Sequence, residues 1–168
     1  MRRIPLIALI VAASLMPAAG LSQSRATRDS MTGVWCGSAR IVVDWAVEKK
    51  LGVRLEIPPS GVVRGQVGDA RLVDGRLETN RGPVGRMLNI QTDYIIVGKL
   101  EGPMIAAERI TRPGVRIPLN WTGSEFRGSV HSKGWKVGGK EHMALTASDL
   151  VLRRWIAPGA KTVLPGAC

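Results

Sequence analysis

LGVRLEI, residues 51–57, alternates apolar and polar side chains with a period of two, and PPSG, residues 58–61, ends the run. This period is typical of a β-strand that buries one face. The next apolar run, residues 62–67, stops at Gly68-Asp69, and Asp74-Gly75 a few residues later predicts a two-residue hairpin turn. The stretch therefore predicts antiparallel strands joined by short turns.

The same succession of apolar runs and turn residues continues towards the C-terminus. Four further runs are separated by turn residues such as Arg112-Pro113-Gly114; they are Tyr94–Leu100, Met104–Ile110, Val115–Trp121 and Phe126–His131. Met143–Arg154 is the last long run. Turn signals recur about every 8 to 14 residues, a spacing that favours an antiparallel barrel or sandwich. We expect an all-β fold, an up-and-down barrel of about eight to ten strands, with a β-sandwich as the second choice.

Residues 39–50 (ARIVVDWAVEKK) fit two patterns. A helix would place Ile41, Val42 and Trp45 on one stripe, whereas a strand would place alternate residues from Ile41 to Val47 on one face. The β-branched Ile-Val-Val cluster favours the strand. We expect a strand here, with the helix as the open alternative.

Met1–Gly20 has the composition of an export signal. Arg2 and Arg3 precede an apolar run over residues 4–16, and PAAG, residues 17–20, offers small residues to a signal peptidase. About 13 apolar residues are too few for a membrane span, which needs roughly 20. We expect a signal peptide over residues 1–20 that is cleaved, and a periplasmic or secreted mature protein without a transmembrane span.

The rest of the 168-residue chain has the length of one domain. We expect a flexible leader over residues 21–31, a barrel domain over residues 32–155 and a C-terminal tail over residues 156–168. The chain has two cysteines, Cys36 and Cys168, whose separation excludes a C-x-x-C motif. In an oxidising compartment we expect them to form a disulfide that ties the tail to the first strand. Free thiols, or pairing between chains, are the alternatives.

The chain is strongly basic. Its formal net charge is +11, and loss of Arg2 and Arg3 with the signal would leave +9. Such a surplus favours an anionic membrane surface, an acidic polysaccharide or an acidic protein as partner. Export argues against nucleic acid. The alternative is that the charge serves solubility alone.

A G-x-W motif, Gly33-Val34-Trp35, opens the first predicted strand, and the last predicted strand ends in Arg153-Arg154. These features resemble the calycin barrels, which include lipocalins and avidins. In lipocalins the tryptophan of G-x-W packs at the closed end of the barrel beneath an arginine from the last strand. The resemblance implies these roles for Trp35 and for Arg153 or Arg154. Cys36 stands where a biotin-contacting tyrosine of avidins is expected, so biotin binding is not implied.

Candidate catalytic and metal-binding groups are few. His131 and His142 would need a third ligand such as Glu141 or Asp149 to hold zinc, and their spacing matches no zinc motif. Ser129, a histidine and Asp149 have the composition of a hydrolase triad, but the chain has no G-x-S-x-G motif. We expect no catalytic residue, no metal and no cofactor.

The most distinctive local composition is HSKGWKVGGKEH, residues 131–142, which holds three lysines, two histidines and a tryptophan. Lysines pair with phosphates or carboxylates, and a tryptophan stacks on a sugar or sits at a lipid interface. A second basic loop, RGPVGR at residues 81–86, is expected to share the same rim. The predicted rim residues are His131, Lys133, Trp135, Lys136, Lys140, His142, Arg81 and Arg86. The alternative is a solvated hairpin whose tryptophan packs on the barrel mouth.

We therefore expect an exported, non-catalytic binding protein for an anionic or apolar ligand, bound in the barrel opposite Trp35 or at the basic rim. A second expectation is a periplasmic protein inhibitor or a protein-interaction module of the envelope, which a filled barrel would favour. A third is a hydrolase or isomerase with a site inside the barrel. That site would need polar side chains to converge there, the candidates being Arg54 or Glu56, Tyr94, His131 and Asp149.

Overall fold

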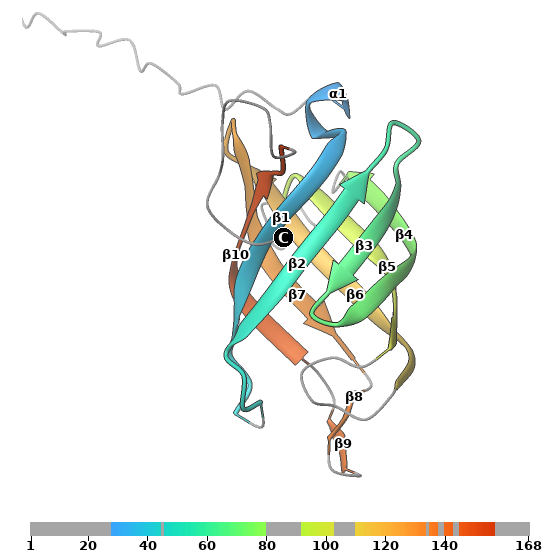
Figure 1. The fold of residues 1–168 in the computed structure, drawn as a ribbon, viewed down its shortest axis with the longest axis vertical. Helices are drawn as coiled ribbons and strands as arrows, with labels where there is room; N and C mark the ends of the chain where they lie inside the picture. The colour runs from blue at the N-terminus through green and yellow to red at the C-terminus, as the bar shows by residue number, and fades with distance from the viewer. Residues whose placement is uncertain are drawn as a thin grey trace, which may run out of the picture.

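The computed structural model describes residues 28–44, 46–79, 92–102, 110–133, 135–137, 140–142 and 145–156. These residues form a closed antiparallel barrel of eight strands and a separate two-stranded hairpin (Figure 1). The predicted all-β, up-and-down barrel is thus confirmed. The predicted signal peptide and most of the predicted leader and tail lie outside the described residues.

Eight strands follow one another around the barrel wall, each paired with the next. Their order is β1 (Gly33–Ile41), β10 (Leu145–Arg154), β7 (Glu125–Ser132), β6 (Ile110–Trp121), β5 (Tyr94–Gly102), β4 (Ala70–Thr79), β3 (Val62–Val67) and β2 (Lys50–Ile57). β1 also pairs with β2, which closes the ring. The hairpin of β8 (Trp135–Val137) and β9 (Lys140–His142) projects from the end opposite the helical turn α1 (Arg28–Met31) (Figure 1).

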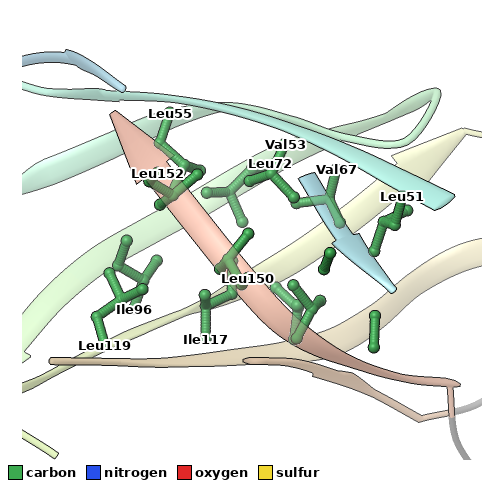
Figure 2. Packing of buried hydrophobic residues seen from close by; sticks show 14 of the residues in the cluster. Leu51, Val53, Leu55, Val67, Leu72, Ile96, Ile117, Leu119, Leu150 and Leu152 are labelled. Carbon is green, nitrogen blue, oxygen red and sulfur yellow. The ribbon is translucent and has the colours of Figure 1, made fainter. Parts of the chain in front are cut away.

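Alternation of side chains gives each strand an apolar inner face. In β2 every second residue from Leu51 to Ile57 is buried, and the residues between them are exposed. The same alternation on the facing strands brings aliphatic side chains such as Ile96, Ile117 and Leu150 to the centre (Figure 2). Burial of this apolar surface is the main force that holds the barrel together.

The interior of the described barrel is filled. Leu55, Ile117 and Leu150 expose 0 % of their surface, so no space as large as a water molecule touches them. Eight-stranded barrels are narrow enough for side chains to fill them in this way. Among the described buried residues only Ser132 is polar, and its Oγ donates a hydrogen bond to the Gly114 carbonyl at 3.1 Å.

Aromatic rings around Trp35 close the α1 end of the barrel. The ring centroid of Trp35 lies 4.7 Å from that of Phe126 and 5.8 Å from that of Trp121, both in edge-on geometry. The indole Nε1 donates a hydrogen bond to the Met31 carbonyl at 2.7 Å. Met31 itself is buried. The last residues of the predicted leader, Arg28–Met31, therefore form α1 and are attached to the barrel end.

The predicted strand over residues 39–50 is only partly correct. β1 ends at Ile41 and β2 begins at Lys50, and the described residues between them form a loop. The Ile41 amide donates to the Lys49 carbonyl at 2.8 Å, which closes this loop, and Val47 is 92 % exposed. The chain has to reverse at the barrel end, and this overrides the local β-propensity.

Asp74-Gly75 does not form the predicted hairpin turn. β4 runs through both residues, Asp74 has a φ of 51°, and the register against β5 shifts between Val73 and Arg76. These are the features of a β-bulge. The positive φ that suits Asp-Gly to a tight turn also suits it to a bulge, so the sequence signal has two structural outcomes.

We predict that Gly37→Ala destabilises the barrel by about 3 kcal/mol, because overpacking at a close backbone approach forces the strands apart. A Cβ at Gly37 would clash with the Val151 carbonyl oxygen on β10. Gly52→Ala is the control, since nothing lies within 4 Å of a Cβ there, and it should change stability by about 0.5 kcal/mol or less. Urea unfolding followed by tryptophan fluorescence measures both. Equal effects of the two substitutions would contradict the close approach.

Candidate functional site

The basic segment 131–142 lies at the barrel end opposite α1. β7 ends at Ser132 and the β8–β9 hairpin follows it (Figure 1). Trp135 pairs with His142, and Lys136 with Glu141, in the hairpin backbone. For these hairpin residues the structure describes the backbone alone. His131 and Lys133, at the foot of the hairpin, are exposed.

Arg81 and Arg86, in the second predicted basic loop, lie outside the described residues, so their place at the rim stays a prediction. The strands on either side of the loop are described. Thr79 at the end of β4 pairs with Tyr94 at the start of β5, and Tyr94 contacts Phe126 in the aromatic cluster around Trp35. The end of β4 and the start of β5 therefore lie at the α1 end of the barrel.

The number of strands predicted between the two basic segments is too high by one. The sequence predicted two strands separated by a turn at Arg112-Pro113-Gly114, whereas β6 runs through these three residues. Loops of an up-and-down barrel alternate between its two ends. With one strand fewer than predicted, β5 begins at the α1 end and β7 ends at the opposite end.

His131 lies on the outward face of β7. Its Nε2 is 2.7 Å from the Ser129 hydroxyl oxygen, and its cross-strand neighbours are Arg116 on β6 and Thr146 on β10. Partial burial lowers the pKa of His131 below its ordinary value, because loss of water disfavours the charged imidazolium. The environment of the ring therefore favours its neutral form.

Ser129, His131 and Asp149 do not form a hydrolase triad. Asp149 Oδ2 accepts hydrogen bonds from Ser148 Oγ at 2.9 Å and from Arg40 Nε at 3.0 Å. The bond from Ser148, followed by that from Arg40, lowers the pKa of Asp149. In a triad the carboxylate would instead orient the histidine. The described residues also contain no group of three histidines, cysteines or acids arranged to hold a metal.

The polar side chains proposed for a site inside the barrel do not converge. Arg54, Glu56, His131 and Asp149 are exposed on the outside. Tyr94 faces inward and is 3 % exposed, and it packs against Phe126 in the aromatic cluster. The arrangement that a hydrolase or isomerase inside the barrel requires is therefore not found among the described residues.

Arg154 is the arginine that covers Trp35. Its guanidinium carbon lies 5.3 Å from the indole centroid, and its Nη2 donates a hydrogen bond to the Ser30 carbonyl. Arg153 points to the outside and binds Glu125. Successive residues of a strand face opposite sides, so only one of the two arginines can reach the tryptophan.

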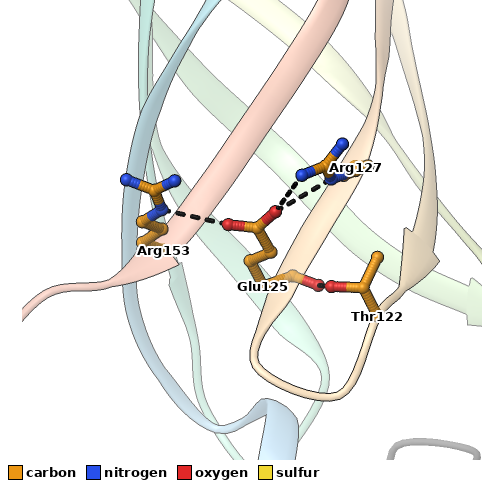
Figure 3. A network of polar contacts seen from close by, with 4 residues as sticks. All are labelled: Thr122, Glu125, Arg127 and Arg153. Carbon is orange, nitrogen blue, oxygen red and sulfur yellow. Dashed lines mark hydrogen bonds and ion pairs between the residues drawn. The ribbon is translucent and has the colours of Figure 1, made fainter.

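Glu125 joins two arginines on the outer wall (Figure 3). Its Oε1 accepts a hydrogen bond from Arg127 Nε at 2.8 Å, and its Oε2 accepts one from Arg153 Nε at 3.0 Å. The bond from Arg153, followed by that from Arg127, holds the pKa of Glu125 below its ordinary value. The sequence does not predict this network, because strand register alone brings Glu125 and Arg153 together.

Cys36 lies on the outward face of β1, with Arg54 on β2 and Arg153 on β10 as its cross-strand neighbours. Its expected partner, Cys168, lies outside the described residues. The disulfide between them therefore stays a prediction.

No protein-family model, curated protein or solved structure matches this chain. Among the described residues no helix has the length and apolar character needed to cross a membrane. Any statement about function therefore depends on the geometry of the barrel itself.

We predict that the ion pairs of Glu125 stabilise the barrel above the pKa of an unfolded glutamate, near 4.5. This contribution is lost as pH falls through the lower pKa of folded Glu125, because the unfolded chain then binds the proton more tightly. Glu125→Gln should lower stability at pH 7 by about 0.5 kcal/mol, since both arginines are exposed, and should weaken the loss of stability in acid.

Urea midpoints at pH 7 and pH 3 measure both effects. Glu56→Gln is the control, because Glu56 is exposed and forms no ion pair with a described residue. An unchanged acid dependence in Glu125→Gln would contradict the assignment.

Proposed function

We propose that this protein is an exported, non-catalytic binding protein of the periplasm or cell envelope, and that it contacts an anionic partner with the outside of its barrel. The observation that carries the proposal is the filled, apolar interior of the described barrel. The charged candidates whose side chains are described, His131 and Lys133, are exposed on the outer wall or at the rim of the barrel.

The filled interior argues against an enclosed apolar ligand. Ligand-binding cavities commonly measure about 300 Å³ or more. Side chains such as Leu55, Ile96 and Leu119 occupy that volume here and expose 0 % of their surface. A ligand could enter only by displacing well-packed side chains, at a cost of several kcal/mol. Of the two ligand classes expected from the sequence, the anionic one is therefore favoured.

The outer wall of the barrel carries the positive charge that an anionic partner would contact. Several exposed basic side chains form no ion pair with a described residue; examples are Arg64, Arg76, Arg116 and Lys133. Other wall arginines are matched by acids, as Arg40 is by Asp149. A net charge of +11 leaves such basic groups in excess over the acids. The excess favours association with an anionic surface or polymer.

Kinship with the calycins is part of the proposal. It is supported by the closed up-and-down barrel and by Arg154 lying over Trp35 at the closed end. The barrel architecture is all that this kinship would transfer, because one fold hosts many functions.

A second candidate function is a protein inhibitor or an interaction module of the envelope. The β8–β9 hairpin favours it, since the hairpin extends beyond the barrel and pairs with no barrel strand (Figure 1). A projecting two-stranded ribbon offers main-chain donors and acceptors to a strand of a partner protein. The basic residues of segment 131–142 would favour an acidic partner.

Native mass spectrometry of the protein isolated from its own periplasm tests the proposal. We expect a barrel without an apolar small molecule, accompanied by an anionic molecule or protein that is lost when the salt concentration is raised. A co-purifying protein whose binding requires the hairpin would favour the second candidate. An apolar molecule retained in high salt would overturn both.

We further predict a disulfide between Cys36 and Cys168 in the exported protein. The outward position of Cys36 on β1 supports it, because a tail crossing the outer wall can reach this side chain. Intact masses without and with reductant should differ by about two daltons, one hydrogen for each thiol that reduction forms. Cys36→Ser should show no difference. Equal masses for the native chain would contradict the bridge.

A further inference from the structure

Hydrogen-bond donors gather around His131 on the outer wall, near the barrel end opposite α1. Arg116 on β6 and Thr146 on β10 are its direct cross-strand neighbours. Ser129 lies two residues before His131 on β7, and so on the same side of the strand. Lys133 follows the end of β7 and is exposed. A guanidinium, an ammonium, an imidazole and two hydroxyl groups thus share one small area.

Asp149 lies opposite Ser129, because the β10 bulge between Ala147 and Leu150 faces Ser129 on β7, but other residues bind its carboxylate. These residues are Arg40 and Ser148. Glu125 lies towards the other end of β7 and is held by Arg127 and Arg153. The positive charge of Arg116 and Lys133 is therefore not neutralised by a described residue.

We propose that this cluster binds a phosphate group. This proposal rests on the proposed function and specifies the chemistry of the anionic partner of the protein. The group is carried either by a lipid headgroup or by a soluble phosphate. The residues of the site share a hydrogen-bond donor and an outward position; they are Arg116, Ser129, His131, Lys133 and Thr146.

The strand register brings side chains from neighbouring strands within reach of one tetrahedral oxyanion. Cross-strand neighbours have their Cβ atoms about 4.5 to 5.5 Å apart, so long side chains from two strands converge on a single group. The planar guanidinium of Arg116 binds two phosphate oxygens at once, and Lys133 contributes a point charge. The hydroxyls of Ser129 and Thr146 complete the set of donors.

His131 makes the site dependent on pH. Its Nε2 contacts the Ser129 hydroxyl, and protonation turns both ring nitrogens into donors. The charged groups nearest to it are Arg116 on β6 and Lys133 just beyond the end of β7, while β10 presents the uncharged Thr146 and, on its bulge, Asp149. The hairpin adds Lys136, Lys140, Glu141 and His142 nearby in the chain. Loss of water around the ring disfavours imidazolium and lowers the pKa of His131, and a bound phosphate acts against this effect.

The test is a proton NMR titration of the two histidines. The Cε1 proton of His131 is followed against pH in chloride and in inorganic phosphate at equal ionic strength, with His142→Gln to assign the signals. We expect phosphate to raise the pKa of His131. Each unit of increase corresponds to about tenfold tighter phosphate binding by the protonated form.

Arg116→Gln should abolish the phosphate-dependent shift. Arg54→Gln is the matched control, because Arg54 is an exposed arginine on β2, four strands from β6 around the wall. It removes the same charge and should leave the shift intact. Urea midpoints check that both variants fold.

A parallel titration with phosphatidylglycerol vesicles, against phosphatidylcholine vesicles, separates the two sources of phosphate. A shift with free phosphate supports a soluble ligand, and a shift with anionic vesicles alone supports a headgroup. No shift with either, or equal losses in Arg116→Gln and Arg54→Gln, overturns the site. If vesicle binding weakens equally in both variants, the phosphate site is wrong, but the proposed binding of an anionic partner is still supported.

Discussion

An eight-stranded barrel has room inside for one set of side chains from each strand, and here that set is apolar and closely packed. This packed apolar interior determines where the charged side chains can lie. Leu55, Ile117 and Leu150 have no contact with solvent, so charged groups have to occupy the outer wall and the two ends. Trp35 and its neighbouring rings close one end. The hairpin of β8 and β9 projects from the other end (Figure 1).

The sequence predicts the strands well where one face is buried and the other is solvated. β2 is the clearest case, because its period of two continues without interruption from Leu51 to Ile57. The predictions are wrong where local chemistry permits two outcomes. Asp74-Gly75 is compatible with a turn and with a bulge, and the Arg-Pro-Gly triplet at residues 112–114 is compatible with a turn and with a strand. Only the pairing of the strands in the closed barrel decides which of the two structures forms at each place.

Some residues of the candidate site could likewise be predicted from the sequence, and others could not. Composition singled out His131 and Lys133, and the period of β7 also places Ser129 on the same side of the strand as His131. Arg116 and Thr146 lie fifteen residues on either side of His131 in the chain, and cross-strand register alone brings them to it. A single sequence carries no direct signal for register. For the same reason the binding of Glu125 by Arg153 could not be foreseen.

The pairing of β1 with β10 has a consequence for how the chain comes to fold. These are the first and last strands of the ring, so β1 keeps an unpaired edge until Arg154 has emerged from the ribosome. Contacts between such distant segments form slowly, and a free strand edge invites pairing with other chains. The barrel therefore cannot close before β10 is available for pairing, so closure of the ring is the last step in which its strands come together.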